Sequence, residues 1–180
     1  MSKIDPKQEL KQLYNPSIKE FSMVDVPALH FLMMHGEGNP NTSLVYKQAV
    51  EALFGLSYTL KFMVKKGASA VDYAVMPLEG LWWVDDMSQF DVHNKDSWKW
   101  TVLIMQPEYV TAELVEVARQ QLSRKKELPA LASLRYERFQ EGQAAQIMYI
   151  GPYANEADTI ARLHNFIERQ GGKLLSLIHI

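Results

Sequence analysis

The chain has 180 residues, of which 47% are hydrophobic and 22% are charged, and these proportions are ordinary for one globular domain. Its net charge of −2 excludes the basic surface that is typical of nucleic-acid binding. The start of the chain is charged and lacks the apolar core of a signal peptide, and no apolar run reaches the roughly 18 residues of a membrane helix. Because cysteine is absent, disulfides and thiol chemistry are excluded. We therefore expect a cytoplasmic protein that acts without nucleic acid or a membrane.

The first part of the chain predicts a short helix, a long strand and a long helix. Residues 5–14 suit a short helix, and the apolar run within Phe21–His35 indicates a strand. After a loop, Thr42 or Ser43 can cap a helix that ends near Gly67. Apolar residues recur along this helix at steps of three and four: Val45, Ala49, Leu53, Leu56, Leu60 and Met63.

One glycine, Gly55, lies inside the predicted long helix. Glycine in a helix costs about 1 kcal/mol relative to alanine, so its presence suggests that something approaches closely there. Either another element or a ligand would explain it, and packing against a strand is the commoner cause.

The segment Tyr73–Trp83 carries the most chemical information. Its composition predicts a strand, and Pro77 and Gly80 interrupt it, so we expect an edge, a bend or a bulge near Glu79. If the neighbouring tryptophans enclose the Glu79 carboxylate, the low dielectric raises its pKa and suits it to proton transfer or to pairing with a cation. The alternative is an exposed glutamate on a strand whose other face is core.

A second strong strand is predicted at residues 98–105, where Trp98 and Trp100 share one face. Thr111 can cap a helix that runs to about Lys126. The remaining pattern predicts strands at 134–139 and 144–150, a helix capped by Asn155 that ends at Gly171-Gly172, and the beginning of another strand from Lys173 to Ile180.

The element order repeats. The segment Met33–Gly36 precedes a loop, a helix and a strand, and the segment Met148–Gly151 precedes the same three elements. We therefore predict a single α+β domain over 1–180, built from two β-α-β-β units. Repeat one covers about 21–107, a connecting helix about 111–126, and an incomplete repeat two about 132–180.

Several motifs of common enzyme classes are absent from the sequence. It contains no phosphate loop, no spaced-glycine dinucleotide fingerprint, no His-Glu-x-x-His and no Gly-x-Ser-x-Gly. The five histidines are scattered without the spacing of metal ligands. We expect neither a metal nor a cofactor.

Five short motifs occur in an order and spacing that are more specific than any one of them: Gly36-x-Gly-x-Pro-Asn41, Leu56-Ser-Tyr58, Pro77-Leu-Glu-Gly-x-Trp82, Trp98-x-Trp100 followed by Gln106-Pro107, and Gly151-Pro-Tyr153. From about Leu10 to Gly172 the chain resembles the GyrI-like small-molecule-binding domain family. The resemblance is to its stand-alone bacterial branch, which is related to the effector-binding domains of multidrug-responsive transcription activators.

The resemblance implies a fold, a ligand class and a set of site residues. It implies two β-α-β-β repeats about a pseudo-twofold axis, with helices on one face of an antiparallel sheet and a ligand groove between them. Family members bind hydrophobic, often cationic or planar aromatic compounds, and some hydrolyse cyclopropane-bearing genotoxic natural products. The resemblance supports Glu79 as the catalytic candidate and Tyr58, Trp82, Trp98 and Trp100 as ligand-binding candidates. We add Met63 and Tyr153 as further ligand-binding candidates.

The C-terminus departs from the family pattern, which usually continues with a strand that carries a His-Glu-x-Tyr-type segment and then a last strand. Leu174–Ile180 has neither that glutamate nor that tyrosine, so we expect the last strand to be missing. Three functions remain open at this point. They are a detoxifying hydrolase with Glu79 as general base, a non-catalytic binder in which Glu79 is the counter-charge of a cationic drug, and a module that binds another protein such as a topoisomerase.

Overall fold

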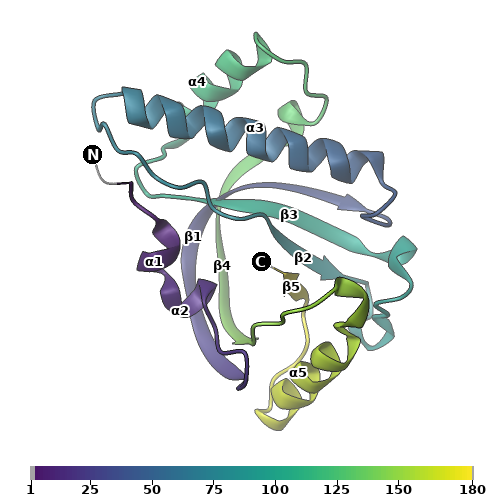
Figure 1. Ribbon diagram of the computed structural model, residues 1–180. Helices are drawn as coiled ribbons and strands as arrows, with labels where there is room; N and C mark the ends of the chain where they lie inside the picture. Colours follow the sequence, from purple (N-terminus) through teal and green to yellow (C-terminus); the bar gives the residue numbers. More distant parts are fainter. Residues whose placement is uncertain (1–2, 180) are drawn as a thin grey trace.

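The computed structural model describes residues 3–179 and shows an α+β fold built around one antiparallel sheet (Figure 1). The strands are β1 Ser22–Glu37, β2 Glu79–Trp83, β3 Lys99–Gln106, β4 Arg135–Gln146 and β5 Leu177–His179, in the order β4-β1-β3-β2-β5. The helices are α1 Pro6–Glu9, α2 Lys11–Tyr14, α3 Leu44–Lys66, α4 Ala112–Ser123 and α5 Ala157–Arg169. Short 3-10 helices cover Met87–Gln89, Lys95–Ser97, Leu131–Ser133 and Tyr153–Asn155. The predicted fold class is confirmed.

The long strand β1 joins the two halves of the sheet. Its C-terminal part, from His30 to Glu37, pairs with β3, whereas its N-terminal part pairs with β4 alone. Pro27 lies in this second part, beyond the last pair with β3. Because proline has no N–H to donate, it is tolerated where the strand has a single neighbour.

The alternation of side chains assigns the two faces of the sheet. Trp100 and Val102 point towards α3, and on the same face the Gln106 Nε2 donates to Ser57 Oγ of α3 at 3.3 Å. Leu103 points to the opposite face together with Glu79, its cross-strand partner on β2. Both faces of β3 are therefore buried, as expected for a central strand.

Helix α3 begins where the sequence predicts, because Ser43 Oγ accepts the Tyr46 N–H at 3.2 Å. Its buried stripe is displaced from the predicted one: Ala49, Ala52, Leu53, Leu56, Ser57, Leu60 and Val64 are buried. Val45 is 49% exposed, so Tyr46 faces the sheet in its place, and Val64 replaces Met63 at the other end. A helix of 3.6 residues per turn allows either phase, and contact with the sheet selects one.

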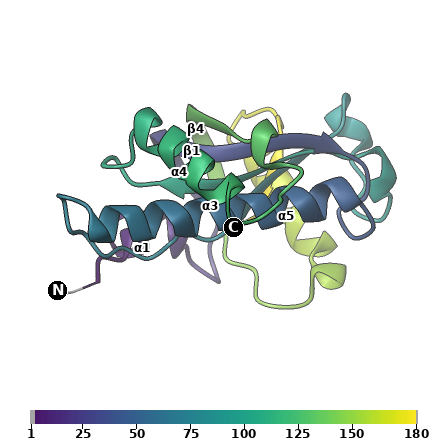
Figure 2. The same cartoon turned by 90° about the horizontal axis from the view of Figure 1, so that it is seen from above.

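Gly55 allows a close approach between helices rather than between a helix and a strand. A Cβ at this position would lie 3.2 Å from Leu128 Cδ1 and 3.4 Å from Leu122 Cδ2. Leu122 belongs to α4, and the two views show α4 beside α3 (Figures 1 and 2). The expected strand contact at Gly55 was wrong.

Three predicted strands have different limits in the structure. The strand expected over Tyr73–Trp83 starts only at Glu79, because Pro77 cannot donate to a ladder, and Tyr73 instead forms an isolated bridge with Ile4. The two strands expected at 134–139 and 144–150 are one continuous strand, β4, which keeps its register with β1 through Gly142. Residues 147–150 lie outside any strand.

The helices are distributed over both faces of the sheet. Helix α3, with α4 packed on it, covers the face of Trp100 and Val102, while side chains from α2 and α5 border a cavity on the face of Leu103. Within residues 3–179, no helix has the length and apolar character to cross a membrane.

Candidate functional site

Glu79 is the first residue of β2, and two cavities meet at its side chain. The extended segment with Pro77 and Leu78 precedes it, and its partner across the ladder is Leu103 on the central strand β3. Only 6% of its surface is exposed. Of the two possibilities left by the sequence, the structure shows the buried carboxyl rather than the exposed one.

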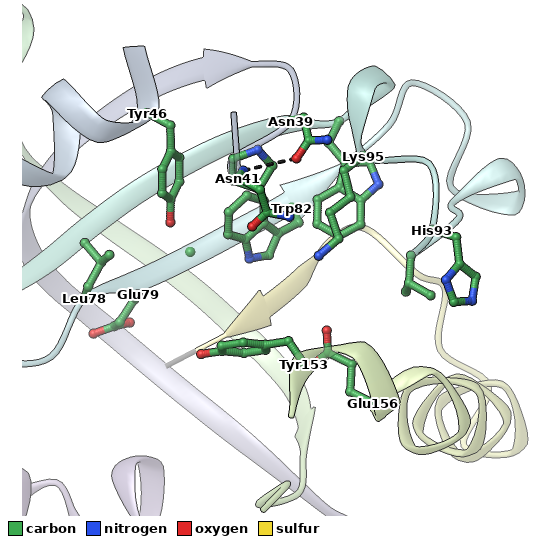
Figure 3. Close-up of a pocket in the computed structure, with 14 residues that line it drawn as sticks. Asn39, Asn41, Tyr46, Leu78, Glu79, Trp82, His93, Lys95, Tyr153 and Glu156 are labelled. Atoms are coloured by element: carbon green, nitrogen blue, oxygen red, sulfur yellow. Dashed lines mark hydrogen bonds between the residues drawn. The ribbon is translucent and has the colours of Figure 1, made fainter. Parts of the chain in front are cut away.

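The first cavity, which we call the aromatic cavity, has a volume of about 520 Å³. Its lining includes Glu79 and the aromatic residues Tyr46, Trp82, Trp98 and Tyr153. Figure 3 shows Tyr46, Glu79, Trp82 and Tyr153 around the cavity. The Tyr46 and Trp82 ring centroids are 5.8 Å apart, and those of Trp82 and Trp98 are 5.4 Å apart. Tyr153 and Glu156 lie across the cavity from Tyr46 and Trp82 (Figure 3). A planar apolar molecule would therefore meet aromatic rings on opposite sides.

Local contacts hold the tryptophans in place. The Trp98 Nε1–H donates to the Asp91 carbonyl at 3.0 Å, and its ring stacks on Phe90 with centroids 5.0 Å apart. Gly80 leaves room for the indole of Trp82, because a Cβ at Gly80 would lie 2.8 Å from that ring. The glycine that the sequence analysis associated with a bend thus permits close contact with a wall of the cavity.

The second cavity, which we call the inner cavity, lies on the sheet face opposite α3 and has a volume of about 300 Å³. Its lining is apolar apart from a few polar groups, and it includes Phe31, Leu103 and Phe139 from three adjacent strands. Helix α2 contributes Tyr14, and β4 contributes Glu141. Glu79, Tyr153 and Glu156 line both cavities, so the carboxyl of Glu79 lies where they join.

The environment of Glu79 brings the pKa of its carboxyl close to neutral pH. Burial raises its pKa to about 7, against the lowering effect of the Tyr14 hydroxyl, which donates to Oε1 at 2.6 Å. The negative charge of Glu141 raises the pKa further. A carboxyl with such a pKa is partly ionised at pH 7 and is a stronger base than an ordinary glutamate, which suits it to general-base catalysis.

Two neighbours of Glu79, Glu141 and Tyr14, also have raised pKa values. Burial raises the pKa of Glu141, and the charge of Glu141 in turn raises the pKa of Glu79. Burial and the charge of Glu79 raise the pKa of Tyr14 well above its usual value. The Tyr14 phenol therefore stays neutral and acts as a hydrogen-bond donor.

The structure brings together four of the seven residues singled out from the sequence. Glu79, Trp82, Trp98 and Tyr153 all line the aromatic cavity. Tyr153 lies at its rim, because 68% of its surface is exposed.

The other three residues line neither cavity. Trp100 is fully buried below the edge of the Tyr46 ring, with centroids 5.1 Å apart. Tyr58 is 48% exposed, since it follows the inward-facing Ser57 and the helical rotation turns it away from the sheet. The buried stripe of α3 includes Val64 rather than Met63, so Met63 does not point into either cavity.

Sequence reasoning missed Tyr14, Tyr46, Glu141 and Glu156. Tyr46 had a detectable signal, because it lies three residues before Ala49 on the buried stripe. Tyr14 and Glu141 had no such signal in the sequence, because they are far from Glu79 along the chain and come near it only in the folded structure. Among the described residues, no group of three or more acidic or histidine side chains is arranged to hold a metal ion.

A cavity lined by aromatic rings and by the buried carboxyls of Glu79 and Glu156 is typical of a small-molecule-binding domain. The family model of the GyrI-like small molecule binding domain matches residues 19–180, and the chain belongs to this family. The residue-level resemblance is thereby confirmed.

Three solved structures from Listeria innocua are similar to this chain. A conserved protein is 34% identical over 98% of this chain and 88% of its own, with a TM-score of 0.86. A protein described as a hydrolase is 36% identical over 94% of this chain and 82% of its own, with a TM-score of 0.82. Another protein described as a hydrolase is 34% identical over 98% of this chain and 92% of its own, with a TM-score of 0.81. A comparison with curated proteins gives no match.

Proposed function

We propose that this protein detoxifies planar, hydrophobic, cyclopropane-bearing genotoxic compounds in the cytoplasm by hydrolysing them, with Glu79 as general base. The observation that carries the proposal is the Glu79 carboxyl, which is 6% exposed, has a pKa of about 7 and lines the aromatic cavity. The description of two similar Listeria innocua proteins as hydrolases supports a reaction rather than binding alone.

The reaction needs only a well-placed water and a proton acceptor. Glu79 takes a proton as the water oxygen bonds to a cyclopropane carbon, and the strained carbon–carbon bond breaks. Its electron pair moves into the fused dienone, which becomes a phenolate, and the proton on Glu79 then returns to that oxygen. Substrate and water are thus joined without a net proton change. General-base catalysis of this kind contributes typically ~10²–10⁴-fold.

The aromatic walls of the cavity would orient a planar substrate. Trp82 and Tyr46 would stack on a planar substrate, with Trp98 supporting Trp82 from behind, and each aromatic contact is worth about 0.5–1.5 kcal/mol beyond the area it buries. The cavity volume of about 520 Å³ is within the range of small-molecule sites. Tyr153 would close over the ligand from the rim. Tyr58, Met63 and Trp100 have no direct contact with a ligand in this arrangement, and Trp100 acts only by supporting Tyr46.

A second candidate is binding without chemistry. An ionised Glu79 between aromatic rings is also the arrangement that holds a cationic aromatic drug, through charge pairing and cation–π contacts. In that case the same cavity sequesters or senses the compound and returns it unchanged.

Incubation of the protein with a cyclopropane-bearing, DNA-alkylating natural product in ¹⁸O-labelled water, followed by mass spectrometry, separates the two functions. We expect a product heavier by one labelled water. It should be lost in Glu79→Gln and retained in Glu127→Gln, a matched change at an exposed position. Intact compound together with quenched tryptophan fluorescence would instead establish a binding protein.

A further inference from the structure

The chain segment before the matched family region is attached to the site. The family model starts at residue 19, and the segment before it contains α1 and α2. Ile4 forms a parallel bridge beside Tyr73, with its N–H donating to the Asp72 carbonyl at 2.8 Å. At the other end of the segment, the Met148 N–H donates to the Ser17 carbonyl at 2.8 Å. The segment is thus held at both ends against the body of the protein.

This attachment brings one functional group to Glu79. Tyr14 is the last residue of α2, and its neighbour Leu13 is buried. The Tyr14 hydroxyl donates to Glu79 Oε1 at 2.6 Å across 65 positions of sequence. Within residues 3–179, no hydrogen bond to the other oxygen, Oε2, is found.

We infer that Tyr14 is a positioning residue for Glu79, which holds Oε1 so that the ionised carboxylate presents Oε2 to the reacting water. This inference rests on the proposed function, because it concerns the same carboxyl. The positioning group, the Tyr14 hydroxyl, comes from the segment before residue 19, which lies outside the matched family region.

The charge balance around Glu79 explains why such a donor matters. Burial and the nearby Glu141 both favour the neutral form of Glu79, and the Tyr14 hydrogen bond is the contact that favours its ionised form. The other titratable groups that line the two cavities are Tyr46 of α3, Tyr149, Tyr153 and Glu156 before α5, and His93 and Lys95 at the far end of the aromatic cavity. Lys95 lies over Trp98 rather than beside Glu79.

Tyr14→Phe is the direct test, because it keeps the ring and removes only the hydroxyl. A hydrogen bond to a charged group is worth about 1.5–3 kcal/mol, so the pKa of Glu79 should rise by about one to two units. Tyr73→Phe is the matched control, since Tyr73 is 1% exposed and its hydroxyl has no hydrogen-bond partner among the described residues.

Two readouts test the role of Tyr14, and the first of them does not depend on the proposed reaction. The first is ¹³C NMR titration of the glutamate carboxyls, with the Glu79 signal assigned by its loss in Glu79→Gln. The second is kcat/KM against pH. At pH values below both pKa values we expect kcat/KM to fall about tenfold or more in Tyr14→Phe, with KM little changed and recovery at alkaline pH. Tyr73→Phe should change neither readout.

The outcomes separate the two proposals. If wild type performs no hydrolysis, the proposed reaction fails, while the NMR titration still decides the role of Tyr14. An unchanged pKa of Glu79 in folded Tyr14→Phe would show a purely structural contact and overturn the inference. If Tyr14→Phe does not fold, 3,5-difluorotyrosine at position 14 retains the ring and strengthens the donor. It must then lower the pKa of Glu79, and no shift would overturn the inference equally.

Discussion

Replacing Glu79 by glutamine should change how the stability of the protein depends on pH. The group has a pKa of about 7 in the folded protein and an ordinary value of 4.5. Between these two pH values the folded state binds more protons than the unfolded state, so stability falls as pH rises. The contribution of the protonated Glu79 carboxyl to the free energy of unfolding is therefore complete below about pH 4.5 and lost above about pH 7.

The magnitude follows from the difference between the two pKa values. A difference of 2.5 units corresponds to about 3 kcal/mol at about 1.36 kcal/mol per unit. Glutamine is neutral throughout and keeps an oxygen that accepts from Tyr14. Relative to wild type, Glu79→Gln should therefore gain about 3 kcal/mol of unfolding free energy between pH 4.5 and pH 8.

Urea unfolding of both proteins over this pH range measures the effect. The difference between them isolates Glu79 together with the groups coupled to its charge, because groups away from the site titrate equally in both proteins. The lowered pKa values of His35 and His164 act in the opposite direction and cancel. Glu127→Gln provides the control and should follow wild type. A difference between Glu79→Gln and wild type that stays constant with pH would refute the argument that burial raises this pKa.

Three further predictions concern packing, capping and charge. Gly36→Ala should cost about 3 kcal/mol of unfolding free energy, because the new Cβ would overlap the Trp100 ring; an unchanged urea midpoint would contradict this. Ser43→Ala should cost about 1 kcal/mol by removing the cap of α3, and Ser43→Asp should restore it in the same urea assay. Glu141→Gln should lower the pKa of Glu79 in the ¹³C NMR titration, opposite to the effect of Tyr14→Phe, and an upward shift would show that the charge of Glu141 is not what Glu79 senses.

Much of the local structure was accessible from the sequence. The caps at Ser43 and Thr111 and the stripes behind them predicted α3 and α4, since capping and helical periodicity depend on residues a few positions apart. The alternation along β3 likewise placed Trp100 and Leu103 on opposite faces. The motifs identified the family and singled out Glu79.

The tertiary structure decided which of these residues share a site. Helical periodicity did not distinguish Val45 from Tyr46, and only contact with Trp82 and Trp100 selects the tyrosine as a wall of the aromatic cavity. The same choice turns Tyr58 and Met63 away from both cavities. Burial of Glu79 and its contact with Tyr14 join segments 65 residues apart. The local sequence thus determined elements and candidate chemistry, whereas the pKa of the carboxyl depends on long-range packing that excludes water and places neighbours from α2 and β4 around it.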